Sequence, residues 1–110
     1  MQERVNEIFI GNKDPYDWFM YEGKDTLMEL LYSTILSIIE EELEEKIAVR
    51  VSFTFNGNDK SMDFLVNRDG IDDTIEKVFD WALENERYEF CSELKEIKER
   101  LQSEDFSYRR

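Results

Sequence analysis

The clearest pattern in the chain is a change in the spacing of its hydrophobic residues near position 47. Before that point they recur every three or four positions, which is typical of one face of a helix. These residues are Leu27, Leu30, Leu31, Ile35, Ile38, Ile39 and Leu43. Asp25 or Thr26 can cap this helix, and Thr26 with Glu29 has the capping-box spacing. The pattern predicts a central helix that continues to about Lys46.

From residue 47 onward, hydrophobic and polar residues alternate, which is typical of a strand with one buried face. The stretch 47–56, IAVRVSFTFN, predicts a strand whose inward side chains are Ile47, Val49, Val51, Phe53 and Phe55. The letters GNDK at 57–60 predict a turn. Met62, Phe64 and Val66 then alternate with polar residues in a returning strand at 61–67. Together these segments predict an antiparallel β-hairpin.

Two segments before the central helix are less regular. Hydrophobic residues are unevenly spaced in 4–10, and this segment favours a short strand over a helical turn. The segment 11–23, GNKDPYDWFMYEG, contains the only proline and is interpreted as a loop. Its aromatic residues either cover the core, which a small domain favours, or form a surface that binds a partner. The candidates for partner contact in this loop are Trp18 and Phe19.

The last third of the chain predicts two further helices. Asp72 or Asp73 can cap the first, whose apolar stripe is Ile75, Val78, Phe79, Ala82 and Leu83. The second, from about 86 to 102, places Phe90, Leu94, Ile97 and Leu101 at spacings of four and three, as in a coiled-coil seam.

The predicted elements indicate an α+β fold. The central long helix packs on the antiparallel β-hairpin, a third strand at the N-terminus is an option, and a C-terminal antiparallel helical hairpin follows. The 110 residues fit a single domain, 1–110, in which residues 71–102 form the helical-hairpin subregion.

Charge narrows the classes of partner. The chain has 14 Lys and Arg against 27 Asp and Glu, a net charge of -13, and no histidine. This field repels phosphate groups, so we expect no direct binding to DNA, RNA or an anionic membrane. The basic residues near the C-terminus do not form a patch, because glutamates are interspersed among them; they are Lys95, Lys98, Arg100, Arg109 and Arg110.

The residue types present argue against an enzyme. Without histidine and with one cysteine, a single chain cannot form a Ser/His/Asp, Cys/His or zinc arrangement of the usual kind. The letters DGIDD lack the remaining ligands of a calcium loop, and no glycine-rich phosphate loop occurs. We therefore expect no catalysis, metal or cofactor. The lone cysteine and the lack of a long apolar run favour a soluble cytoplasmic protein.

One stretch carries a family signature. Residues 71–101, IDDTIEKVFDWALENERYEFCSELKEIKERL, resemble the UVR motif, the helical hairpin of the repair proteins UvrB and UvrC and of several bacterial regulatory proteins. The residues that match the family pattern are Tyr88, Glu89, Cys91, Leu94, Lys95, Glu96 and Leu101, and Ala82, Leu83 and Asn85 suit the approach to the turn. Three positions depart from the pattern. Phe90 replaces a charged residue, Ser92 replaces an alanine, and Lys98 stands where an aliphatic residue is expected.

The resemblance implies a protein-docking role, because UVR hairpins pair with another hairpin or with a partner protein. The partner-binding candidates on this helix are Tyr88, Phe90, Cys91, Leu94, Ile97 and Leu101. The leading hypothesis is a non-catalytic interaction, adaptor or regulatory module that binds another protein, and homodimer formation is left open. The alternative is an acidic inhibitor that mimics nucleic acid and occupies a DNA- or RNA-binding protein, as some small phage proteins do against host defence or regulation.

Overall fold

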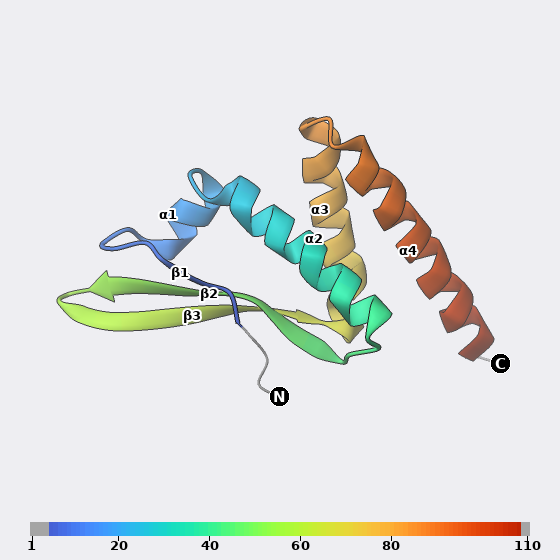
Figure 1. The fold of residues 1–110 in the computed structure, drawn as a ribbon, viewed down its shortest axis with the longest axis horizontal. Coiled ribbons are helices and arrows are strands. Elements are labelled where there is room, and N and C mark those ends of the chain that lie inside the picture. Colours follow the sequence, from blue (N-terminus) through green and yellow to red (C-terminus); the bar gives the residue numbers. More distant parts are fainter. Residues whose placement is uncertain (1–4, 109–110) are drawn as a thin grey trace.

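The computed structural model describes residues 5–108, with side chains described for 5–102; Arg109 and Arg110 lie outside this part. It has the predicted α+β fold, with a helical pair packed together at the C-terminal end (Figure 1). The elements, in chain order, are β1 (Glu7–Phe9), α1 (Pro15–Met20), α2 (Lys24–Glu40), β2 (Glu45–Phe55), β3 (Asn58–Asn67), a 3-10 turn (Arg68–Gly70), α3 (Ile71–Glu84) and α4 (Tyr88–Tyr108).

The strands form one three-stranded sheet in the order β1-β2-β3. β1 pairs parallel with β2, which confirms the strand expected within 4–10, and β2 pairs antiparallel with β3, which confirms the hairpin. The turn predicted at 57–60 is wrong at both ends, because the turn is Asn56–Gly57 and residues 58–60 already belong to β3. Both turn residues have positive φ, 51° and 77°, the geometry that matches the twist of paired strands.

The predicted inward face of β2 is wrong at its first member because of a β-bulge. The register with β3 shifts between Ile47 and Val49, so Ala48 is an extra residue and the side chains before it change faces. Val49 and Val51 are buried. Ile47 instead pairs with Leu65, an exposed residue on the opposite face.

That opposite face carries an ion pair in its centre. The Arg50 Nε donates to Asp63 Oδ1 at 2.7 Å, and the guanidinium also lies 3.8 Å from Glu7. The hydrogen bond from Arg50, with a smaller contribution from its charge, lowers the pKa of Asp63 below its ordinary value. Polar side chains therefore stabilise the middle of a sheet face that no described helix covers.

The core lies between the other face of the sheet and the helices. α2 packs on β2 and on α3, and α3 packs on α4. The residues of the main buried cluster are Ile35, Ile38, Ile39, Ala48, Val66, Ile71, Ile75, Val78, Trp81, Ala82, Cys91, Leu94 and Ile97. A second cluster under α1 contains Phe19, Leu27, Val49 and Val51.

The central helix is shorter than predicted at its C-terminal end. α2 ends at Glu40 rather than near Lys46. The reversal follows the Schellman pattern, in which Glu42 has a positive φ of 54° and the Leu43 N–H donates to the Ile38 carbonyl at 3.0 Å. Arg68 donates to the same carbonyl. Five glutamates between 40 and 45 oppose the negative end of a longer helix, which explains the early stop.

The start of α2 also differs from the prediction. The N-cap is Gly23, which has no side chain, so the capping box of Thr26 and Glu29 is wrong. A Cβ at Gly23 would lie 2.4 Å from the ring of Trp18. The glycine is needed because this ring packs directly on the backbone.

We expect Glu42→Gly to raise the free energy of unfolding by about 0.5–1 kcal/mol, because glycine adopts a positive φ without the steric cost that a Cβ imposes. Urea denaturation measures the change. Glu41→Gly is the matched control. Residue 41 has a φ of -98°, so glycine brings no advantage there. Equal effects at both positions would contradict the argument from φ.

The segment 11–23 is not a loop throughout. Pro15–Met20 form α1, and the Asp14 carboxylate caps it by accepting the Tyr16 N–H at 2.8 Å. Phe19 is buried against Phe64, with ring centroids 4.0 Å apart, and Trp18 is half-buried. The expected covering of the core is confirmed for these two residues, whereas the two tyrosines of the segment are exposed.

α3 follows the 3-10 turn directly. Gly70 is its N-cap, so the predicted caps Asp72 and Asp73 are wrong, although both lie in the first turn, where their charge favours the helix. The predicted stripe is buried at Ile75, Val78 and Ala82, half-buried at Phe79 and exposed at Leu83. Trp81, which the stripe omits, is buried.

α4 bears out the predicted seam. Leu94 and Ile97 are buried, and Phe90 and Leu101 are half-buried. The helix begins at Tyr88 and runs to Tyr108, beyond the predicted end at 102.

Candidate functional site

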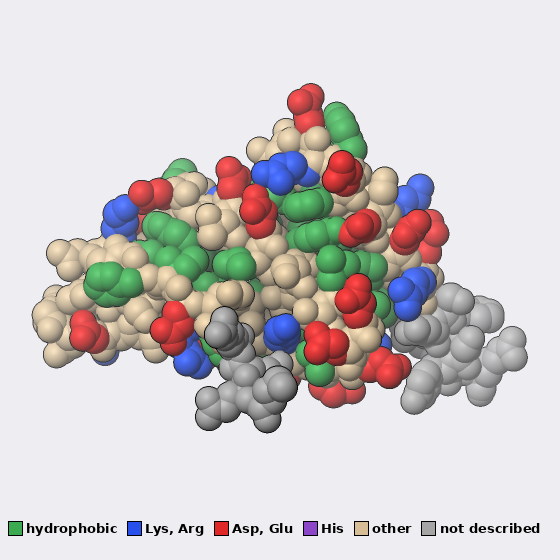
Figure 2. All heavy atoms as spheres, viewed as in Figure 1, with side chains coloured by type: hydrophobic (Ala, Val, Ile, Leu, Met, Phe, Trp, Pro, Cys, Tyr) green, Lys and Arg blue, Asp and Glu red, His purple; other side chains and the backbone are tan. Residues whose placement is uncertain are grey.

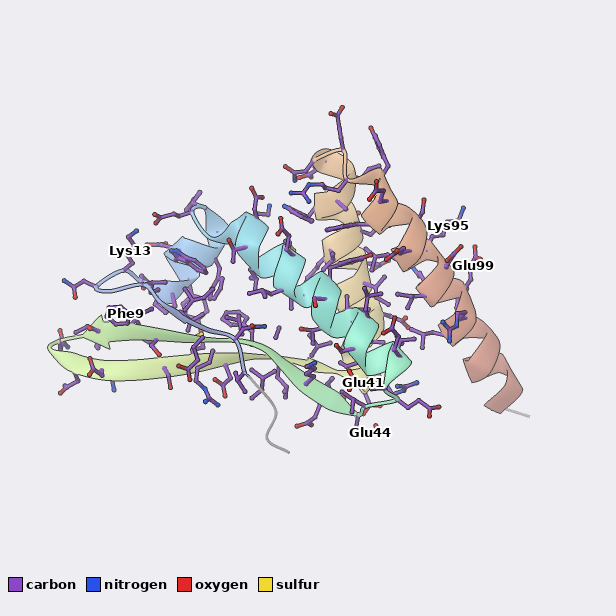
Figure 3. The ribbon with its side chains drawn as sticks, viewed as in Figure 1. Phe9, Lys13, Glu41, Glu44, Lys95 and Glu99 are labelled. Carbon is purple, nitrogen blue, oxygen red and sulfur yellow. The ribbon has the colours of Figure 1, made fainter. Side chains whose placement is uncertain are left out.

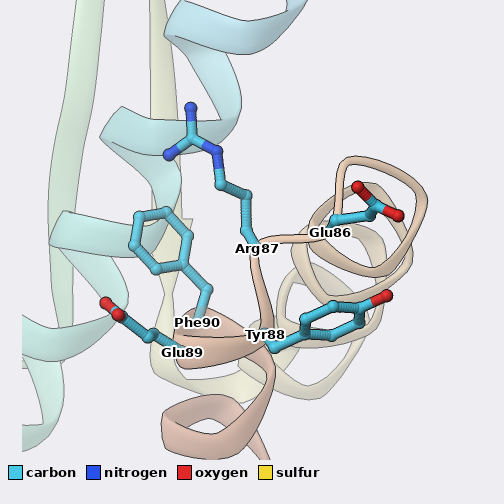
Figure 4. A pocket seen from close by; sticks show the side chains of 5 residues that line it. All are labelled: Glu86, Arg87, Tyr88, Glu89 and Phe90. Atoms are coloured by element: carbon cyan, nitrogen blue, oxygen red, sulfur yellow. The ribbon is translucent and has the colours of Figure 1, made fainter.

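The candidate site is the sharp turn between α3 and α4. Glu86 has a positive φ of 58°, and its N–H donates to the Leu83 carbonyl at 3.2 Å. The Arg87 N–H donates to the Ala82 carbonyl at 2.7 Å, which completes a second Schellman reversal. This geometry places residues 86–90 around a hollow of about 300 Å³ (Figure 4).

Two side chains of this turn point toward α2 (Figure 4). The Phe90 ring stacks on Tyr32, with centroids 4.0 Å apart and planes 4° apart. The Arg87 guanidinium lies 5.5 Å from the Phe90 centroid and 5.4 Å from the Trp81 ring, and it donates to Glu29 at 3.1 Å. Stacking, cation–π contacts and an ion pair therefore fix the turn to α2.

Further hydrogen bonds join the three helices below the turn. Trp81 Nε1–H donates to Asp25 Oδ1 at 2.9 Å, and the Tyr32 hydroxyl donates to Glu93. Phe90 is thus part of the packing between helices. It is not a free surface residue.

The other side of the turn faces away from α2. Tyr88 is 59% exposed and Leu83 is 51% exposed, and in Figure 4 the Tyr88 ring and the Glu86 carboxylate point away from Phe90. Glu84 is exposed on the last turn of α3. We call Leu83, Glu84, Glu86 and Tyr88 the acidic knob. The Tyr88 ring suits insertion into an apolar recess of a partner, and the two carboxylates suit a recess whose rim is cationic.

The eight residues predicted to bind a partner have different environments. Phe19, Cys91, Leu94 and Ile97 are buried, and the Cys91 thiol lies 3.9 Å from the Phe79 carbonyl. Trp18, Phe90 and Leu101 are half-buried, and Tyr88 alone is well exposed. α1, which carries Trp18 and Phe19, lies just before α2, and its side chains belong to a different cluster from those of α4, so the structure does not bring the two groups together (Figure 1).

The sequence analysis missed Glu84, Glu86 and the role of Arg87 at this turn, and it assigned Leu83 to the buried stripe. Asn85 carries a usable signal, since asparagine is common where a helix reverses, although the positive φ falls on the next residue, Glu86. The exposure of Leu83 has no such local signal.

Within residues 5–102, no group of three or more Asp, Glu or Cys side chains is arranged to hold a metal ion. Among the described helices, none combines the length and the apolar character that a membrane crossing requires.

Comparisons of the chain with protein-family models, curated proteins and solved structures gave no match. The resemblance of residues 71–101 to the UVR motif therefore stays a prediction.

Proposed function

We propose that the protein is a non-catalytic protein-binding module of the adaptor or regulatory kind, which docks a partner through its C-terminal helical pair. The observation that carries the proposal is the acidic knob. An exposed tyrosine and leucine flank a turn that Arg87 and Phe90 hold against α2. A ring on a fixed support loses little conformational freedom on binding, and aromatic residues supply much of the energy of protein interfaces.

The knob also specifies the chemistry of the partner. Two carboxylates, Glu84 and Glu86, accompany the apolar side chains. A buried carboxylate without a counter-charge is costly, so the complementary surface needs lysine or arginine at its rim and an apolar recess at its centre.

The alternative is that the acidic surface mimics nucleic acid and occupies a DNA- or RNA-binding protein. The observation that favours it is the spread of carboxylates over the face in Figure 2, together with the net charge of -13. Such a partner would release the protein when duplex DNA is added, whereas a partner bound by the knob would not.

Tyr88 is a sharper probe of docking than Phe90, because Phe90 supports the fold. We expect Tyr88→Glu to abolish partner binding and to leave the melting temperature nearly unchanged, since the side chain is exposed and the new carboxylate would be buried only in the complex. Tyr21→Glu is the matched control. Tyr21 is also exposed but lies in the segment between α1 and α2, outside the turn.

The partner can be identified with a photo-crosslinking phenylalanine in place of Tyr88, mass spectrometry of the product, and the same probe at Tyr21. Crosslinks at 88 alone, lost with Leu83→Glu, support docking through the knob. Equal crosslinking at both positions would contradict it, and displacement by duplex DNA would favour the mimic.

A further inference from the structure

A second exposed apolar surface lies at the tip of the β-hairpin. The tip extends beyond α2, and α1 is too short, at six residues, to cover it. A hollow of about 440 Å³ remains between the start of α1 and the sheet. Its apolar lining, which we call the aromatic hollow, consists of Pro15, Tyr16, Phe53, Phe55 and Met62.

The aromatic hollow is unusual because it exposes side chains from the face of the sheet that is buried elsewhere. Phe55 and Met62 alternate with polar residues that point outward. They therefore lie on the same face of the sheet as the buried Val51 and Val66. Yet Phe55 is 57% exposed, and Tyr16 is 66% exposed beside it. Large apolar side chains grouped in this way on a soluble domain mark an interaction site.

Lysines line the hollow together with these aromatics. Lys13 and Lys60 contribute to its wall, and Lys13 also pairs with Glu22 at 2.6 Å. The carboxylate of Asp14 is engaged as the cap of α1. Lys60 has no ion-pair partner among the described side chains. In Figure 3, Lys13 lies at this end of the molecule, and Glu41 and Glu44 lie at the far end of α2.

We propose that the aromatic hollow receives the acidic knob of a second copy of this chain. The inference rests on the proposed docking role of the knob and names its partner. The knob needs an apolar recess with a cationic rim, and the hollow provides both. Its volume lies within the range of pockets that enclose small ligands, which is enough for one tyrosine side chain. Tyr88 enters the hollow, and Glu86 approaches Lys60.

This contact joins two different surfaces, so it is heterologous and produces a ring or an open chain of copies. The surfaces are small, and the association is therefore weak and dependent on concentration. Salt lowers it, because the pairing of glutamate with lysine at the rim is screened.

Sedimentation velocity of the purified chain tests the proposal. Between about 10 µM and about 1 mM, where a weak contact becomes populated, the average mass is expected to rise. Tyr88→Ala and Phe55→Ala are each expected to return the chain to monomer with unchanged circular dichroism, and Tyr21→Ala is expected to associate like the original chain.

A charge exchange then tests the pairing itself. Lys60→Glu and Glu86→Lys are each expected to stay monomeric alone, because each variant has a knob and a hollow of like charge. An equal mixture of the two is expected to associate again, with the variants alternating in equal number. The lysine knob of one variant fits the glutamate hollow of the other, and the original knob fits the original hollow. A mixture that stays monomeric overturns the pairing of these surfaces.

A monomer throughout the concentration range also overturns the inference, as does self-association that Tyr88→Ala and Phe55→Ala leave intact. These results test self-association only, and they leave the proposed docking role to be tested by crosslinking. If the knob crosslinks to a different protein while the purified chain stays monomeric, the docking role stands and only the second copy is excluded.

Discussion

Trp81→Ala is expected to lower the free energy of unfolding by about 3–5 kcal/mol, the usual cost of truncating a large buried aromatic side chain. Trp81 is 3% exposed and lies in the main core cluster. Its Nε1–H donates to Asp25 on α2, and the Arg87 guanidinium lies over its ring. The substitution therefore opens a cavity and removes the contacts that join the end of α3 to α2. Urea denaturation followed by circular dichroism measures the loss.

Two variants separate the contributions of packing and hydrogen bonding. Asp25→Ala leaves the ring in place but removes the acceptor and a carboxylate in the first turn of α2, and it is expected to cost about 0.5–1.5 kcal/mol. Trp18→Ala changes the other tryptophan, which lies in α1 and is half-buried, and is expected to cost less than Trp81→Ala. A loss below about 1 kcal/mol for Trp81→Ala would show that α3 does not pack on α2 as described.

Leu94→Ala is expected to cost about 2–5 kcal/mol, because the side chain is fully buried at the centre of the seam between α3 and α4. α4 makes its main helix contacts with α3, so its attachment depends strongly on this residue. Hydrogen exchange is expected to show a greater loss of amide protection in α4 than in α2.

The neighbouring Lys95→Ala provides the control for Leu94→Ala. Lys95 is exposed, and its substitution is expected to change stability by no more than about 0.5 kcal/mol. Similar effects at 94 and 95 would mean that the seam does not hold α4 in place.

Hydrophobic spacing predicted the elements whose apolar residues recur at a regular interval. The central helix, the hairpin and the seam of α4 follow from it. It was insufficient for α3, because α3 packs on both α2 and α4 and its buried surface is wider than a single stripe. This explains why Trp81 is buried although it stands beside the stripe. The register shift at Ala48 depends on how β2 packs, so hydrophobic spacing also missed it.

The candidate site was predicted only in part. The UVR resemblance directed attention to Tyr88, which is the exposed member of the set. It could not reveal that Phe90 stacks on Tyr32, because that contact joins helices that are distant in sequence. The aromatic hollow could not be predicted from the sequence either, because it forms where the hairpin extends past α1 and α2.

The β-bulge at Ala48 also has an electrostatic consequence for the helix above it. The extra residue leaves Lys46 on the same side of the sheet as the buried Val66, and the Lys46 ammonium donates to Ser37 Oγ in the last turn of α2 at 3.1 Å. Regular alternation would have placed Ile47 there and turned the ammonium outward. The inserted residue thus places a cation at the negative end of the α2 dipole. This cation offsets the run of glutamates there, whose charge is unfavourable at that end of the helix.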